Sequence, residues 1–140
     1  MLLDNDVREQ LSQYLRLMEN DILIKISVAD DSASAQMSEF VRELAGLSAK
    51  IHVEETELPR VPSFSINKIK QDVGITFAGI PLGHEFTSLV LALLQTSGYP
   101  PKIDASLVEQ IKNIKGTFNF ETYVSLTCHN CPEVVQALNI

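Results

Sequence analysis

The chain contains two cysteines, Cys128 and Cys131, and they lie three positions apart near the C-terminus. The segment before them, residues 118–127, is rich in alternating aromatic and β-branched residues, a pattern that predicts a strand. The segment after them, residues 132–138, opens with proline and glutamate and predicts the first turns of a helix. A helix N-terminus offers unpaired N–H groups and partial positive charge, which favour the thiolate form of the first cysteine. The chemistry that this arrangement predicts is reversible thiol–disulfide exchange.

The composition limits the classes of protein to which the chain could belong. Its 140 residues, 45% of them hydrophobic, suit one ordinary domain or two small ones. A net charge of −7 without a basic stripe argues against a nucleic-acid or membrane partner. Residues 1–6 lack the features of a secretory signal, and no apolar run approaches transmembrane length, so we expect a cytoplasmic protein. In that reducing compartment a lone cysteine pair is typical of catalysis or metal binding.

Hydrophobic periodicity predicts an opening helix followed by the element order β-α-β-β-β-α. The predicted helices span residues 5–19, 33–47 and 82–96, and the predicted strands span residues 21–28, 50–56, 63–67 and 74–78. This order resembles a small thioredoxin-like fold of the α/β class. Val61-Pro62 lies where such folds carry a cis-proline before the third strand. Residues 29–33, where a thioredoxin would carry its cysteine pair, contain no cysteine, so we expect this unit to be redox-silent.

A second thioredoxin-like unit is expected to begin after the first. We divide the chain into a thioredoxin-like unit without redox cysteines (1–97), a linker (98–104) and an incomplete second unit with the Cys-X-X-Cys motif (105–140). A helix at 105–114 leads into the predicted strand, but the later strands of the second unit are missing. An unpaired strand is prone to association. Residues 117–140 are therefore expected to be disordered, to dock on the first unit, or to pair with another copy in a homodimer.

Two longer runs, residues 77–94 and 120–132, closely resemble the N-terminal domain of the flavoprotein component of bacterial alkyl hydroperoxide reductase. The resemblance implies tandem thioredoxin-like folds, of which only the second carries the cysteine pair. It further implies electron flow from NADH to FAD, to a cysteine pair of the flavoprotein body, to the N-terminal pair, and finally to the peroxiredoxin component of the same reductase. The chain has no glycine-rich dinucleotide motif, so FAD and NADH are expected to bind outside it. As a fragment, it is expected to be weakly active or inactive alone.

The motif and the resemblance together assign roles to four residues. Cys128, the first cysteine, is the predicted nucleophile, and Cys131 is the predicted, more buried resolving thiol. In the resembled family a glutamate at the place of Glu85 lies near the reactive cysteine, which implies help in proton transfer; the alternative is a first-turn residue that complements the helix dipole. Thr127 is a candidate donor to the thiolate, although it also suits the end of a strand.

Other interpretations of the cysteine pair stay open. His129 either favours the thiolate when protonated or is a solvent-facing spacer. A zinc site would need four ligands, and His52, His84 and His129 are far apart in the sequence. The motif also resembles that of heavy-metal-associated domains, which bind Cu(I) through paired thiolates before a helix, so a copper carrier is the rival function. A third alternative is a scaffold that docks partners through its first unit, with idle cysteines.

Overall fold

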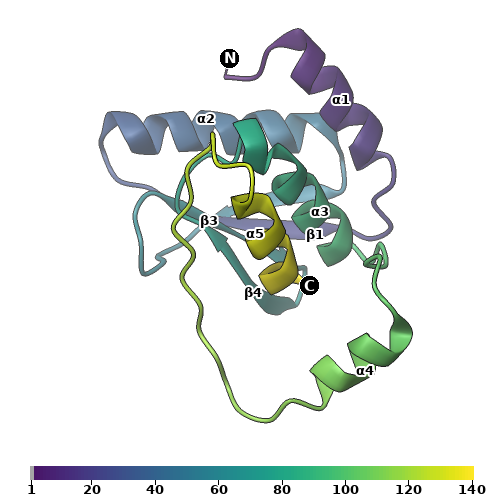
Figure 1. Cartoon of the computed structure of the whole chain (residues 1–140). Coiled ribbons are helices and arrows are strands. Elements are labelled where there is room, and N and C mark those ends of the chain that lie inside the picture. The colour runs from purple at the N-terminus through teal and green to yellow at the C-terminus, as the bar shows by residue number, and fades with distance from the viewer. Residues whose placement is uncertain (1) are drawn as a thin grey trace.

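Four strands of the described residues, 2–140, form one mixed sheet of order β2-β1-β3-β4 in the computed structural model (Figure 1). The strands are β1 (Ile22–Ser27), β2 (Ile51–Glu55), β3 (Ser63–Lys68) and β4 (Gln71–Phe77). The helices are α1 (Asn5–Leu15), α2 (Ser32–Leu47), α3 (Phe86–Thr96), α4 (Ala105–Lys112) and α5 (Cys131–Asn139). A single 3-10 turn, η1 (Gly83–Glu85), precedes α3.

The sheet has one parallel and two antiparallel pairs of strands. Strand β1 pairs with β2 in parallel, which requires the crossover that α2 provides. On its other side β1 pairs with β3 in the antiparallel direction, and β3 pairs with β4 in the same way. The observed order from β1 to α3 is the β-α-β-β-β-α order that the sequence predicts.

The hydrophobic core lies between one face of the sheet and helices α1, α2 and α3. Ile24 of β1 is in register with Ile66 of β3, and Ile66 is in register with Ile75 of β4. Because alternate residues of a strand face the same side, these side chains form one apolar surface under the helices. Phe64 is fully buried there, and its ring contacts those of Phe40 and Phe77.

Three element bounds differ from the prediction. Strand β4 begins at Gln71, which is paired with Lys68, so the predicted six-residue polar turn is a tight connection of two residues. The opening helix ends at Leu15 instead of continuing to residue 19. The predicted helix at 82–96 divides into η1 and α3, since Gly83 has a φ of +58°, outside the right-handed helical region.

The predicted strand at residues 118–127 is absent. Residues 117–125 are extended, but they form no ladder with the sheet or with each other. A strand requires a neighbour for its backbone N–H and C=O groups, and in the described residues this segment has none. It returns the chain from α4 toward the start of α3 (Figure 1). The local sequence pattern is therefore real, but the pairing that would make it a strand is missing.

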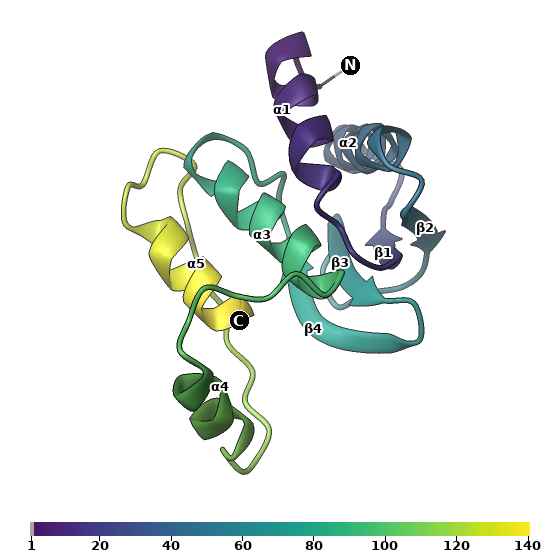
Figure 2. The same ribbon diagram turned by 90° about the vertical axis from the view of Figure 1, so that its right-hand side faces the viewer.

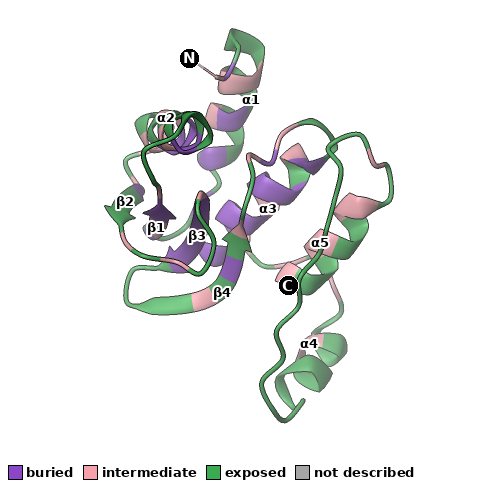
Figure 3. Cartoon of the chain, turned by 90° about the vertical axis from the view of Figure 1, so that its left-hand side faces the viewer, coloured by how far each residue is buried: buried purple, intermediate pink, exposed green. Residues whose placement is uncertain are grey.

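Helix α5 docks on the first unit. It contacts α3 and η1, and α3 lies between α5 and the sheet (Figure 2). Docking is thus the one of the three predicted arrangements that this structure shows. Neither α4 nor α5 has a buried residue, and the extended segment between them is exposed (Figure 3). None of the helices within residues 2–140 has the length and apolar composition needed to cross a membrane.

Candidate redox site

Cys128 and Cys131 form a disulfide at the beginning of α5. Their Cα atoms are 5.6 Å apart, within the range that a disulfide requires. Helix α5 begins at Cys131, and Pro132 occupies its first turn, where the missing N–H of proline costs no hydrogen bond. Both cysteines are half-buried, so the burial class does not separate the predicted nucleophile from the predicted resolving thiol.

The N-terminus of α5 is directed at the sulfur of Cys128. The backbone N–H of Cys131 donates to Cys128 Sγ at 3.2 Å, while the N–H of Cys128 donates to the carbonyl of Ser125 at 3.0 Å. An N–H group at a helix N-terminus stabilises negative charge. When the disulfide is reduced, this geometry favours the thiolate of Cys128 over its thiol.

Thr127 contacts Ser125 in this oxidised site. The two hydroxyl oxygens lie 3.0 Å apart, and the backbone N–H of Thr127 donates to Ser125 Oγ at 3.3 Å. Thr127 therefore helps to shape the turn that precedes the cysteines. Its predicted hydrogen bond to the thiolate concerns the reduced pair and stays a prediction.

Glu85 is buried under the site, with only 2% of its surface exposed. The hydroxyl of Ser88 donates to Glu85 Oε1 at 2.7 Å, and Gln136 Nε2 donates to Ser88 Oγ at 3.2 Å. The other carboxylate oxygen, Oε2, is buried without a partner among the described residues. The predicted alternatives for Glu85, proton transfer and helix capping, thus meet a third feature, since a hydrogen-bonded chain joins it to the cysteine helix. Ser88 and Gln136 carry no motif that sequence reasoning could have detected.

Residues of η1 contact the loop that carries the cysteines. The backbone N–H of His84 donates to the carbonyl of Leu126 at 2.9 Å, and its ring meets that of His129. A Cβ on Gly83 would lie 2.8 Å from the same carbonyl oxygen, so only glycine permits this approach. Two of the three histidines that are far apart in the sequence are therefore neighbours. Within residues 2–140, no three or more His, Cys, Asp or Glu residues are grouped as metal ligands.

The loop before β3 also reaches the C-terminal segment. The Val61–Pro62 peptide bond is cis, as the resemblance to thioredoxin-like folds predicts. Arg60, next to it, forms an ion pair with Glu121 at 2.9 Å, and the hydroxyl of Tyr123 donates to the same carboxylate. The hydrogen bond from Arg60 is the main reason that the pKa of Glu121 lies below its ordinary value, and the same bond raises the pKa of Arg60.

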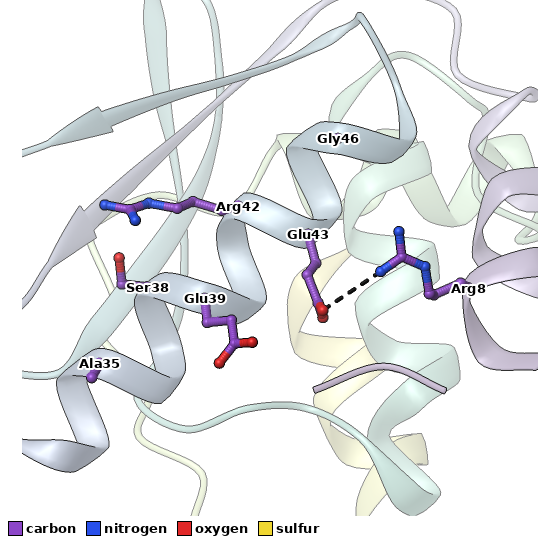
Figure 4. Close-up of a pocket in the computed structure, with 7 residues that line it drawn as sticks. All are labelled: Arg8, Ala35, Ser38, Glu39, Arg42, Glu43 and Gly46. Carbon is purple, nitrogen blue, oxygen red and sulfur yellow. Dashed lines mark ion pairs between the residues drawn. The ribbon is translucent and has the colours of Figure 1, made fainter. Parts of the chain in front are cut away.

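A shallow pocket between α1 and α2 lies away from the cysteines (Figure 4). Its polar groups already have partners: Arg8 forms an ion pair with Glu43, which also accepts the backbone N–H groups of Leu2 and Leu3. Glu43 thus holds the first residues of the chain against α2. The pocket has a structural explanation and contributes nothing to the redox site.

Sequence comparison identifies relatives over the whole chain. The chain is 59% identical over 140 residues to a protein named NADH dehydrogenase from Bacillus subtilis. It is 52% identical over 139 residues to the alkyl hydroperoxide reductase flavoprotein, AhpF, from Staphylococcus epidermidis. The chain spans 28% and 27% of the lengths of these two relatives. No protein-family profile matches the chain.

Structural comparison points to the same class of protein. The N-terminal domain of AhpF from Enterococcus faecalis matches with a TM-score of 0.83 and 29% identity, over 98% of this chain and 72% of that one. A protein disulfide oxidoreductase from Aeropyrum pernix has the same fold, with a TM-score of 0.81 at 19% identity. The fold and the cysteine pair place the chain among thioredoxin-like disulfide oxidoreductase domains. In sequence and in structure it matches the N-terminal domain of AhpF, the flavoprotein of alkyl hydroperoxide reductase.

Proposed function

We propose that the chain is an electron-relay module, which passes electrons from an NADH- and FAD-dependent flavoprotein body to a peroxiredoxin. The observation that supports it most directly is the Cys128–Cys131 disulfide at the N-terminus of α5, with the N–H of Cys131 on the sulfur of Cys128. The similarity to AhpF supplies the direction of electron flow and the partner, which is the peroxiredoxin component of alkyl hydroperoxide reductase.

The proposed exchange transfers two electrons in two steps. The Cys128 thiolate attacks one sulfur of the peroxiredoxin disulfide, which forms a mixed disulfide and releases the other peroxiredoxin sulfur as a thiolate. The Cys131 thiolate then attacks Cys128, which restores the disulfide seen here and releases the second peroxiredoxin thiol. The peroxiredoxin is reduced and the module is oxidised. A cysteine pair of the flavoprotein body reduces the module again by the same chemistry.

The remaining parts of the relay lie outside this chain. FAD and NADH would be bound by the rest of the longer flavoprotein, in the cytoplasm. We expect the 140-residue chain to be weakly active or inactive alone. The exposed aromatic side chains of the segment that leads to the cysteines support this expectation, because they have no core to join in the described residues. They are Phe118, Phe120 and Tyr123.

Mixed-disulfide trapping in the full-length flavoprotein tests the proposal. Cys131→Ser should accumulate a covalent complex with the peroxiredoxin through Cys128, because the resolving step is lost. Cys128→Ser should form no such complex and should abolish peroxiredoxin reduction by NADH. Unchanged peroxiredoxin turnover in Cys128→Ser would contradict the relay.

The reduction potential of the isolated chain provides a second measurement. A relay should have a potential between those of thioredoxin and glutaredoxin, about −270 to −200 mV. Tight Cu(I) binding by the reduced chain against a competing chelator, without exchange activity, would instead favour the copper carrier.

A further inference from the structure

Three side chains form a directional hydrogen-bonded chain between α5 and the first unit. Gln136 donates to Ser88 at 3.2 Å, and Ser88 donates to Glu85 at 2.7 Å. Ser88 and Glu85 are both buried, with 0% and 2% of their surfaces exposed. An ionised carboxylate only accepts, so the hydroxyl proton of Ser88 is committed to Glu85 and its oxygen is left as an acceptor for the Gln136 amide. Glu85 thereby determines which way the Ser88 hydroxyl is turned.

A second contact holds the other side of the disulfide. The backbone N–H of His84 donates to the carbonyl of Leu126, two residues before Cys128. Gln136 lies five residues after Cys131, on the helix that follows the motif. The first unit therefore grips the loop before the cysteines and the helix after them with residues of one short segment, 84–88.

Apolar packing alone holds α5 weakly. The helix has nine residues, a length at which an isolated helix is not stable in water, and none of its residues is fully buried. Val134 and Leu138 are both exposed. Among the described residues, the bond from Gln136 to Ser88 is the side-chain hydrogen bond that joins α5 to the first unit.

We propose that Gln136 and Ser88 are positioning residues that hold the N-terminus of α5 against the sulfur of Cys128. The thiolate of Cys128 depends on the N–H of Cys131, and that N–H points at the sulfur only while loop and helix keep their relative orientation. Glu85 takes part by orienting Ser88, in addition to any proton transfer. The inference rests on the proposed redox function and assigns to it two residues with no recognised motif.

The test measures the reactivity of Cys128 in the 140-residue chain. In a Cys131→Ser background, which keeps the backbone N–H at that position, the rate of alkylation by iodoacetamide is followed against pH. Gln136→Ala should move the midpoint to higher pH by about 0.3 to 1 unit, since the loss of one hydrogen bond corresponds to a two- to ten-fold change. Asn139→Ala is the matched control, because Asn139 is a half-buried amide on the same helix without a side-chain hydrogen bond in the described residues. An unchanged midpoint in Gln136→Ala, with circular dichroism like that of the control, would overturn the proposal.

The variant Ser88→Ala shows whether the two residues act as one unit. It should shift the midpoint in the same direction, and the double variant with Gln136→Ala should shift it no further than the larger single change. Additive shifts would mean that the residues act independently and would overturn the linked chain. The outcome is separate from that of the relay, since peroxiredoxin reduction by the unmodified flavoprotein tests the relay regardless of these variants.

Discussion

The imidazole of His84 meets that of His129 edge to face, with their ring centroids 4.4 Å apart. His129 lies between the two cysteines, whereas His84 belongs to η1 of the unit that has no cysteine. The first unit is therefore part of the redox site, although its own strand-to-helix turn holds no redox residues. The close approach of η1 to the cysteine loop makes the contact available to mutation.

Replacing Gly83 should loosen the cysteine loop. In Gly83→Ala the added Cβ would lie 2.8 Å from the carbonyl oxygen of Leu126, and the φ of +58° is unfavourable for alanine by about 1 kcal/mol or more. We expect faster hydrogen exchange at His84 and faster proteolysis near Leu126. Gly79→Ala is the control, because nothing lies within 4 Å of its added Cβ. Equal protection in the two variants would show that the approach is not required for docking.

Acid should weaken the contact between the cis-proline loop and the extended segment. The pKa of Glu121 is lowered from 4.5, chiefly by the hydrogen bond from Arg60. Because the pKa is lower in the folded state, the stabilisation is complete above the ordinary value of 4.5 and is lost as pH falls through the lowered value. The effect should be small and sensitive to salt, since both side chains are exposed.

The measurement is an NMR titration of Tyr123 and its neighbours with acid. In Glu121→Gln the pH dependence near Tyr123 should disappear, while that of distant carboxylates should not change. A titration curve that is the same in both proteins would contradict the predicted role of the ion pair.

The stability of the chain should depend on the first unit and little on the exposed aromatic residues that follow it. Phe64→Ala should lower the free energy of unfolding by about 3–5 kcal/mol, because the ring is fully buried against two others. Phe120→Ala should change it by less than about 0.5 kcal/mol, because that ring is 69% exposed. Chemical denaturation measures both. A large loss for Phe120→Ala would mean that the C-terminal segment has a core of its own in solution.

The turn before α2 has a structural role in place of a redox role. Asp31 Oδ1 accepts the backbone N–H of Ser34 at 2.7 Å and caps the helix. We expect Asp31→Ala to lower the free energy of unfolding by about 1 kcal/mol, measured by thermal unfolding. Asp30→Ala, one residue earlier, is the control and should have no comparable effect. If the two variants were equally stable, the cap would be without energetic weight.

Much of the fold could be predicted from local patterns. The elements of the first unit follow from hydrophobic periodicity and cap residues, and the helix after the cysteines begins where proline and glutamate predict it. The cis bond at Pro62 was expected from the resemblance to thioredoxin-like folds. These features depend on residues that are close in the sequence or on a recognised motif.

The prediction was wrong where a structure depends on a partner. Residues 118–127 have the composition of a strand, but composition cannot supply a neighbouring strand, and the segment is unpaired in this structure. The neighbouring rings of His84 and His129 were missed for the related reason that their distance in the sequence says nothing about their distance in space.

By itself, the sequence determined the chemistry: two thiols, three positions apart, with a helix beginning at the second. That information is local, because helix caps and turns are set by residues within one or two turns of each other. Only the tertiary structure decided which groups surround those thiols. Gln136 and Ser88 are 48 residues apart along the chain, and the backbone preferences of neither residue specify the other. Their contact exists because α5 packs on α3, and packing between elements is a property of the folded chain as a whole.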